Sequence, residues 1–366
     1  MTLSKRNIIF ITLLISQQFW TIKIIGMSAP MMQLALIFPL IIRSFAKIEY
    51  KFYFTMLLLA IYAVLSNPNA GLQYIQYTSL FSIISLVFWL FSAALIYHMR
   101  MFVLNRATGY ISIAVLAIAL FAAFFTSPQA LISPQDGAVG FFNEKGLFGF
   151  YLSIIFCTIY LSFNSRTSSI ALVISILYLL FIIEALRTLL VYIALLLIYL
   201  ESSRKNIFHM LLIAFAVLFV ISLLYYCGIF DSLLLKLEII KDNTGGIGRY
   251  AATYVIANSS FTDLMFGHGF GTYFAVRETF LATPSDIDYD YAGSFLLEMF
   301  VELGVILTSI LLLGITKLIY KKVNIPLFAS ILILSLIGGK QDLQMLFSFI
   351  MFSLFYSRIK ELCSPL

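Results

Sequence analysis

Charged residues are scarce in this chain of 366 residues. They make up 11% of it, whereas a soluble domain carries about 25%. Hydrophobic residues account for 62%, and the mean hydropathy is +1.02. Apolar runs recur from Ile8 to Tyr356 with only short polar breaks between most of them. The composition excludes a soluble globular protein and predicts an all-α polytopic membrane protein.

Cysteine and histidine are rare as well, with three of each. Cys157 lies inside an apolar run, Cys227 at the end of one and Cys363 in the C-terminal tail, so neither a disulfide framework nor a zinc-binding spacing is present. The sequence also lacks the GxxxxGK loop and a GxGxxG turn after a strand, which bind nucleotide phosphates. We therefore expect no metal, no nucleotide and no other cofactor.

The apolar runs predict one membrane domain over residues 1–366 with twelve spans. The stretch 168–200 is interpreted as two short spans, with Glu184 and Arg187 at an external turn between them. The first run is interpreted as a retained span, because another follows at once and no small-residue cleavage site is present. The predicted spans are 8–25, 28–42, 52–66, 77–97, 109–126, 147–163, 168–184, 188–200, 207–226, 293–313, 325–338 and 343–357.

Lysine and arginine are distributed unevenly between the predicted loops. Fifteen of the 23 fall on one side, together with only Glu49, Glu201 and Glu361. The positive-inside rule places that side, and both termini, in the cytoplasm. The pI of 9.0 then reflects membrane orientation, and we expect no nucleic-acid partner. The fifteen are Lys5, Arg6, Arg43, Lys47, Lys51, Arg100, Arg106, Arg166, Arg204, Lys205, Lys317, Lys321, Lys322, Arg358 and Lys360.

Two predicted external loops are long, 127–146 and the large loop 227–292 between spans nine and ten. Loops of this length in a compact protein are usually functional. The large loop predicts an amphipathic helix over 231–241, a break at Thr244-Gly245-Gly246, a second helix over 249–258 and a glycine turn at 267–271.

A few cations do not follow the charge pattern, because they lie at external ends of spans or in external loops. Arg187 is the most informative, since it sits between two apolar runs. Its planar guanidinium suits phosphate oxygens, although an ion pair with Glu184, three residues away, is the alternative. Arg249 and Arg277 are further candidates, and for them a solvated surface position or a pair with Glu278 is the alternative.

Two acids fall inside a predicted span. Glu298 and Glu302 are four residues apart and so lie on one helical face. Acids in a span usually face a cavity or the bundle interior, and the alternative role is to accept hydrogen bonds from a backbone amide or a buried arginine. His268, between two glycines, is a candidate contact to substrate or simply a loop residue.

Four segments, in order, carry a resemblance to one family. They are Gly140-Phe141-Phe142-Asn143-Glu144-Lys145-Gly146-Leu147-Phe148-Gly149, the pair Arg187-Thr188, the stretch from Gly248-Arg249 to Gly269-Phe270-Gly271, and Ser294 to Ile306 with its Glu-x-Gly. Together they resemble the central helix start, the span start, the periplasmic loop and the following helix of O-antigen polymerases and O-antigen ligases. The resemblance covers roughly residues 136–310.

The departure from that pattern separates the two activities. Ligases carry His-Asn about eight residues before the glutamate, where this chain has Gly293-Ser294. The resemblance therefore favours a polymerase. It implies a GT-C-like fold in the bacterial inner membrane that joins undecaprenyl-diphosphate-linked repeat units at the periplasmic face by metal-independent, inverting glycosyl transfer. A ligase, a lipid-linked oligosaccharide flippase and a small-solute transporter are the alternatives.

The resemblance also implies the partners and the functional residues. The expected partners are lipid-linked glycans, membrane lipids, a chain-length regulator and a flippase. The expected catalytic residues are Arg187, Arg249, Glu298, Asp290 and Glu144, and the expected substrate-binding residues are Arg277, Lys145, His268, Tyr250 and Glu302.

Overall fold

The architecture was analysed in a computed structural model. Only the backbone is described for residues 5–6, 16, 23–24, 27–28, 130, 145, 180–181, 186, 244–250 and 343–344. The structure describes residues 5–16, 23–24, 27–28, 38–39, 42–44, 46–50, 52–54, 57–58, 61, 89–100, 102–131, 139, 142, 145–181, 186–202, 244–273, 276–277, 294–338 and 343–363.

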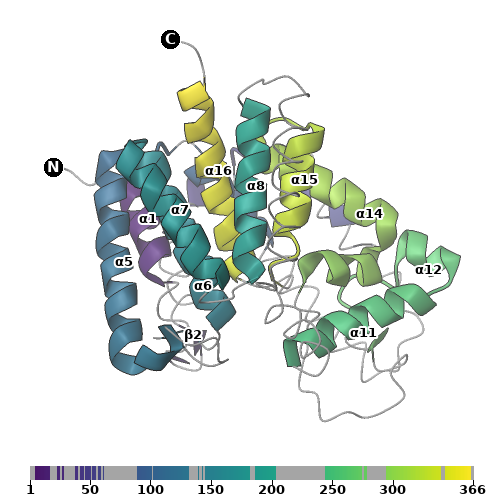
Figure 1. Ribbon diagram of the computed structural model, residues 1–366. Helices are drawn as coiled ribbons and strands as arrows, with labels where there is room; N and C mark the ends of the chain where they lie inside the picture. Colours follow the sequence, from purple (N-terminus) through teal and green to yellow (C-terminus); the bar gives the residue numbers. More distant parts are fainter. Residues whose placement is uncertain are drawn as a thin grey trace.

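The described chain is almost entirely helical (Figure 1). The exception is a pair of two-residue antiparallel strands, β1 (Lys23–Ile24) and β2 (Met27–Ser28). The remaining elements are α1 (Lys5–Ser16), a helix over Trp89–Met99, α5 (Arg106–Thr126), the 3-10 turn η2 (Pro128–Leu131), α6 (Lys145–Phe163), α7 (Arg166–Phe181), α8 (Leu186–Ser202), α11 (Thr244–Asn258), α12 (Phe261–Phe266), α14 (Phe295–Tyr320), α15 (Ile325–Leu334) and α16 (Leu343–Cys363).

Among the described residues, three helices are long and apolar enough to cross a membrane. They are Arg106–Thr126, Gly146–Phe163 and Phe295–Tyr320. A membrane core of about 30 Å needs roughly 20 apolar residues in a helix, and these segments approach or exceed that length. The chain is therefore an integral membrane protein by helix length and composition.

The centre of the bundle is α16. Every residue from Met345 to Tyr356 is buried, and four phenylalanines of this helix fill the space between α6, α8 and α14. Its sequence is apolar on all sides, as expected for a helix with neighbours all round. Tyr320 and Tyr356 pack edge to face with ring centroids 5.0 Å apart, so α14 is fixed against α16.

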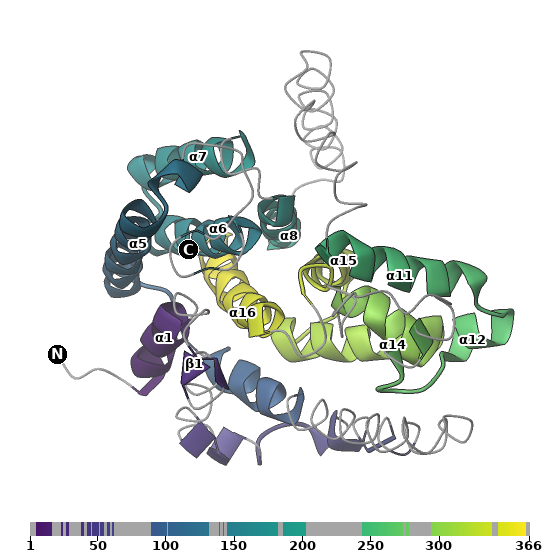
Figure 2. The ribbon, with the colours of Figure 1, turned by 90° about the horizontal axis from the view of Figure 1, so that it is seen from below.

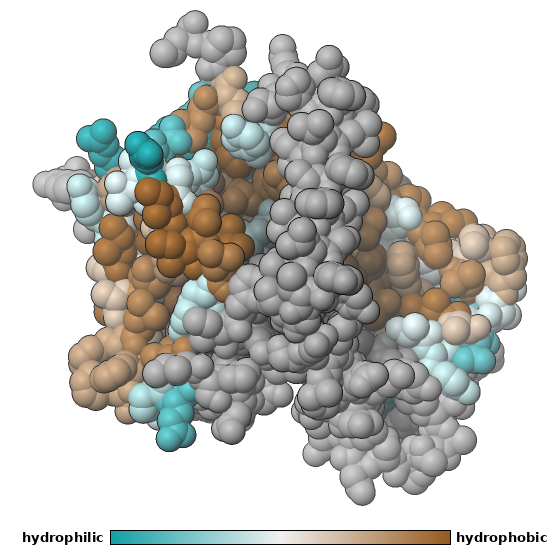
Figure 3. All heavy atoms as spheres, in the orientation of Figure 1, coloured by the Kyte–Doolittle hydropathy of each residue, from teal (hydrophilic) through white to brown (hydrophobic). Residues whose placement is uncertain are grey.

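The outer helices have the opposite character. On α5, Tyr110, Phe121, Phe124 and Phe125 are largely exposed, and α7 exposes a similar apolar face. Figure 3 shows apolar surface over this part of the molecule. Large exposed apolar surfaces are rare in water-soluble monomers. We interpret the outer faces of α5 and α7 as lipid-facing.

The helix α14 is broken at Gly304. This residue has φ +67° and ψ −178° within a run of otherwise helical residues. Figure 1 shows the two segments of α14 running in different directions, the first above α11 and the second toward α15. The Thr308 hydroxyl donates a 2.8 Å hydrogen bond to the Met299 carbonyl across the break. The break interrupts the backbone hydrogen bonds of the helix, and this side-chain bond gives one of the freed carbonyls a donor.

Polar contacts gather at one end of the bundle, which we call the basic end. Lys317 forms a 3.2 Å ion pair with Glu49, Lys322 pairs with Glu201, and Arg358 Nε donates to the Leu161 carbonyl at 3.1 Å. The charged residues come from four separate stretches that the sequence assigned to one side. The structure therefore brings them together, while the side of the membrane that they face stays a prediction.

Several predicted spans match the helices. Spans 109–126, 147–163, 168–184, 188–200 and 325–338 overlap α5 to α8 and α15, and the division of 168–200 into two helices is confirmed. Span 207–226, the amphipathic helix 231–241 and most of 28–88 lie outside the described residues.

Four predictions were wrong in detail. The first span, 8–25, ends as a helix at Ser16, where the apolar run meets the polar Ser16-Gln17-Gln18, and Lys23 lies in a strand. The span over 293–313 is two helical segments, because Gly304 breaks it. The predicted break at Thr244-Gly245-Gly246 is instead the first turn of α11, where glycine costs a helix only about 1 kcal/mol. Cys363 ends α16 and is not in a tail.

Candidate functional site

The end of the bundle opposite the basic end carries α11, α12 and the first segment of α14, and we call it the loop end (Figures 1 and 2). The helix α11 packs on α14 through a small apolar cluster of Ala252, Val255, Tyr273 and Val301. Phe295 and Leu296 donate their backbone N–H groups to the carbonyls of Gly338 and Ser335. The loop end is therefore attached to the bundle at the start of α14.

The predicted glycine turn at 267–271 is confirmed. Gly267, Gly269 and Gly271 have φ values of +76°, +111° and +84°, which favour glycine. The turn lies directly on the break in α14: a Cβ on Gly267 would overlap the Glu302 carbonyl, and a Cβ on Gly304 would overlap the backbone of Met265. Two glycines are thus required where the two backbones cross.

The crossing also satisfies carbonyls freed by the helix break. His268 N–H donates to the Val301 carbonyl at 3.0 Å, and Gly269 N–H donates to the Glu302 carbonyl at 2.8 Å. A helix carbonyl near a break has no partner four residues later, so a neighbouring backbone must supply the donor. The turn and the break stabilise each other.

The Glu302 side chain belongs to the same arrangement. It is 0% exposed, and its Oε1 accepts a 3.2 Å hydrogen bond from the Tyr273 backbone N–H. This is the structural role that the sequence left open for an acid in a span. Glu302 holds the chain that follows the glycine turn against α14.

Tyr273 and Glu298 form the polar part of the loop end. Tyr273 is 2% exposed and Glu298 is 3% exposed. Burial raises the pKa of the Tyr273 hydroxyl, the charges of Glu298 and Glu302 raise it further, and Arg277 opposes them. The charges of Glu298, Glu302 and Arg277 therefore all act on Tyr273. The Tyr273 hydroxyl therefore stays protonated at neutral pH.

His268 is fixed by Ser259. The Ser259 hydroxyl donates to the Val255 carbonyl at 2.7 Å, so its oxygen accepts from His268 Nε2–H at 3.2 Å. A hydroxyl has a single proton, and this assignment places the imidazole proton on Nε2. Burial lowers the pKa of His268, and Asp263 opposes the shift. A neutral, oriented imidazole results.

The segment before α6 is anchored by two residues. Val139 and Phe142 exchange backbone hydrogen bonds of 3.0 Å, and both side chains are buried. The Phe142 ring packs against Phe148 and Tyr151 with centroids 5.7 and 5.3 Å apart. Lys145 then begins α6, so the backbone places this cation at the N-terminus of a membrane-length helix.

Arg187 lies in the first turn of α8 and is partly exposed, while Thr188 beside it is 0% exposed. The first turn of α8 and the helix α11, whose backbone carries Arg249 and Tyr250, both lie toward the lower part of the view in Figure 1. The structure thus brings two of the predicted arginine-bearing segments to one end of the bundle.

The other predicted residues have different outcomes. Glu298, Glu302, His268 and Arg277 share the loop end with Tyr273. Asp290, Glu144, Glu184 and Glu278 lie outside the described residues. Among the residues that are described, no three His, Cys, Asp or Glu side chains could together hold a metal ion. Metal-independent chemistry stays a prediction.

Sequence reasoning missed two features of the loop end, Tyr273 and the break at Gly304. A glycine two residues after a buried acid in an apolar run was a usable signal for the break, since glycine is unfavourable within a helix. Tyr273 carried no local signal, because it is one of 21 tyrosines and its role depends on the turn before it.

The comparisons with known proteins add no relative. No family model, no curated protein and no solved structure matches this chain.

Proposed function

We propose that this protein is a membrane glycosyltransferase of the O-antigen polymerase type, which extends a polysaccharide from lipid-diphosphate-linked repeat units at the loop end. The observation that supports this most is the burial of two acids, Glu298 and Glu302, in the first turns of a membrane-length helix, with the equally buried Tyr273 bonded to Glu302 through its backbone N–H. Two of the four sequence segments that resemble the polymerases, 248–271 and 294–306, include the elements of the loop end. A structural bundle needs no such cluster of ionisable groups.

The proposed donor is the growing glycan on a polyprenyl diphosphate. Its diphosphate contacts Arg187 and Arg249, with Arg277 and Lys145 as further contacts. The acceptor hydroxyl oxygen forms a bond to the anomeric carbon, and the bond from that carbon to the diphosphate oxygen breaks with its electron pair passing to the diphosphate. Attack from the opposite face inverts the anomeric configuration. Fixed cations stabilise the charge that builds on the leaving group.

The proton of the acceptor hydroxyl passes to a carboxylate. Glu298, Asp290 and Glu144 are the candidates. Glu298 is favoured among the described residues, because Glu302 already accepts the Tyr273 amide and acts as a positioning residue. Tyr273 keeps its proton at neutral pH and serves as a donor to a sugar hydroxyl, whereas the neutral His268, whose Nε2–H is donated to Ser259, contacts the sugar as an acceptor at Nδ1. Tyr250 completes the proposed sugar contacts.

The deciding experiment is complementation of a strain that lacks this protein in a host that makes the polymer. Loss of a polymerase leaves one repeat unit on the lipid core, whereas loss of a ligase or a flippase leaves none. A pattern with no repeat unit would contradict a polymerase. The readout is the polysaccharide ladder on a gel.

Arg187→Lys tests the phosphate clamp. We expect the ladder to disappear, because a point charge does not replace the planar guanidinium at a diphosphate. Arg166→Lys is the matched control, since Arg166 is exposed in the first turn of α7 at the other end of the bundle. Membrane levels of both variants are measured by immunoblot. A full ladder from Arg187→Lys would remove Arg187 from the clamp.

A further inference from the structure

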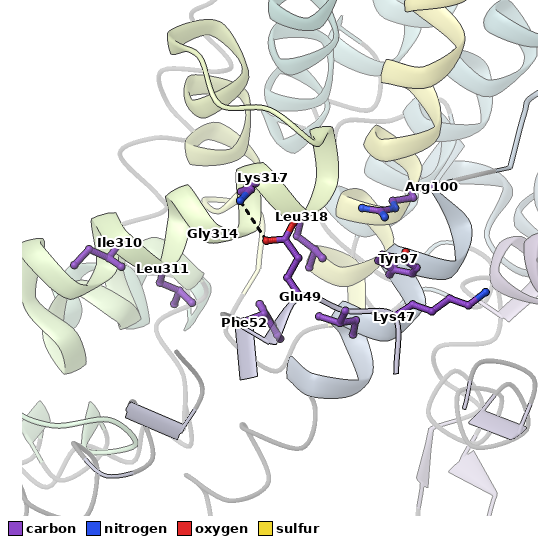
Figure 4. A pocket seen from close by; sticks show the side chains of 11 residues that line it. Lys47, Glu49, Phe52, Tyr97, Arg100, Ile310, Leu311, Gly314, Lys317 and Leu318 are labelled. Carbon is purple, nitrogen blue, oxygen red and sulfur yellow. Dashed lines mark hydrogen bonds and ion pairs between the residues drawn. The ribbon is translucent and has the colours of Figure 1, made fainter. Parts of the chain in front are cut away.

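A cavity of about 390 Å³ lies at the basic end, far along α14 from the break at Gly304 (Figure 4). Three stretches form it: the chain around 47–52, the end of the helix Trp89–Met99 with Arg100, and the last turns of α14. We propose that this cavity binds one anionic phospholipid, with the phosphate at its cationic side and an acyl chain along α14.

The charge of the lining favours an anion. Lys47, Arg100 and Lys317 contribute three cations, and Glu49 contributes one carboxylate. Figure 4 shows Glu49 directed at Lys317, with which it forms the 3.2 Å ion pair, so the carboxylate is already engaged. Lys47 extends away from that pair, at the edge of the cavity. The site therefore keeps positive charge in excess.

Arg100 is the anchor of the proposed phosphate site. Its guanidinium stacks on the Tyr97 ring at 3.7 Å from the centroid, which fixes its plane. None of the ion pairs between described residues includes Arg100, and its buried Nε has no hydrogen-bond partner among them. An oriented arginine without an acid partner is suited to bind a phosphate oxygen.

The rest of the lining is apolar, which separates a lipid from a soluble anion. Ile48, Phe52, Ile310, Leu311 and Leu318 face the cavity. Free phosphate would cover none of this surface. The apolar lining continues along one face of α14, where Ile306 and Ile310 are exposed at 42% and 51%. A fatty acyl chain is the part of a phospholipid that such a surface contacts.

Basic pockets between membrane helices are known to bind anionic lipid headgroups. Here the pocket joins the last turn of α14 to two stretches far earlier in the chain. Among the described polar contacts, the Lys317–Glu49 ion pair is the only one that joins α14 to these two stretches. A bound lipid would therefore add a second link between them.

The test uses the full-length protein purified in detergent. Native mass spectrometry counts retained lipid, and titration with phosphatidylglycerol gives the affinity. We expect one tightly held phosphatidylglycerol, and we expect neither phosphatidylcholine nor inorganic phosphate to compete for its site. Arg100→Gln should weaken binding about fivefold or more, since one basic group near an anionic headgroup has about that effect. Arg166→Gln, at an exposed arginine, should bind as the wild type does.

Gly314 gives a steric test that leaves every charge in place. A Cβ at Gly314 meets no atom of the described residues within 4 Å, so Gly314→Trp places an indole in the cavity and should abolish retention of the lipid. Gly314→Ala should retain it, because one methyl group leaves room. Unchanged affinity in both Arg100→Gln and Gly314→Trp would overturn the proposal. Equal binding of phosphatidylcholine, or displacement by inorganic phosphate, would overturn it as well.

Discussion

At the loop end, Glu298 and Glu302 are buried beside a tyrosine and the backbone of a glycine turn. At the basic end, Glu49 and Glu361 remain exposed and pair with Lys317 and Arg358 on the surface. Burial of a carboxylate is costly unless hydrogen bonds compensate it, whereas an exposed pair loses little water. Glutamate thus holds backbone segments in place at the loop end, whereas Glu49 and Glu361 at the basic end form ion pairs that stay in contact with water.

The comparison shows where the structure is sensitive. The loop end depends on close backbone approach and on hydrogen bonds made in a confined space, so single atoms matter there. At the basic end, the Lys317–Glu49 and Arg358–Glu361 pairs depend on charges that water can replace, although Glu201, paired with Lys322, is largely buried. Substitutions at the two ends should therefore differ strongly in their effect on stability.

The largest effect is expected for Gly304→Ala. The residue has φ +67°, and a Cβ would overlap the backbone of Met265. Left-handed geometry costs a non-glycine residue about 1–2 kcal/mol, and with the overlap we expect about 3 kcal/mol or more of lost stability. Thermal unfolding of the purified protein measures it. The control is Gly314→Ala in the same helix, where space is open and alanine should be neutral or slightly stabilising.

An intermediate effect is expected for Glu302→Leu. The Tyr273 N–H would lose its acceptor in a buried place, which costs about 1–3 kcal/mol. Glu302→Gln keeps a carbonyl oxygen at that position and should lose much less. Equal unfolding temperatures for the two variants would contradict the positioning role. A wild-type polysaccharide ladder from Glu302→Gln would show that the charge of Glu302 is dispensable for the reaction.

A smaller, pH-dependent effect is expected at His268. Burial lowers its pKa below the ordinary 6.5, so the unfolded chain binds the proton more readily. His268 therefore contributes stability fully above pH 6.5, and that contribution falls as the pH drops toward the folded pKa. His268→Gln keeps a donor for Ser259 and should flatten the pH dependence of unfolding in that window. An unchanged slope would contradict this assignment.

The smallest effect is expected for Glu361→Gln, which removes an exposed pair with Arg358 one helical turn away. Such pairs contribute about 0.5 kcal/mol or less. Arg358→Gln should cost more, because Arg358 Nε also donates to the Leu161 carbonyl and joins α16 to α6. Thermal unfolding of both variants decides the order. If Glu361→Gln cost as much as Gly304→Ala, the contrast between the two ends would fail.

The sequence predicted the helices of the bundle core well, because a long apolar run has few other ways to satisfy its backbone in a membrane. The division of 168–200 into α7 and α8 followed from a charged pair inside an apolar stretch. The glycine turn at 267–271 followed from its composition. These features are local, and local patterns are sufficient to find them.

The candidate site was only partly predictable. The burial of Glu298 and Glu302 was expected from their place in a span, but the partner of Glu302 is the amide of Tyr273, 29 positions earlier. The break at Gly304 exists because another backbone crosses there, and periodicity does not report such a crossing. The helix α11 also begins at Thr244, earlier than predicted, because Gly245 and Gly246 had been interpreted as a break.

The buried position of α16 has a consequence for assembly. Ribosomes deliver α5, α6, α8 and α14 to the bilayer before this helix is made. Until then, the surfaces that later contact its phenylalanines must rest against lipid or each other. The bundle therefore closes late in biosynthesis, around a core that arrives after the helices surrounding it.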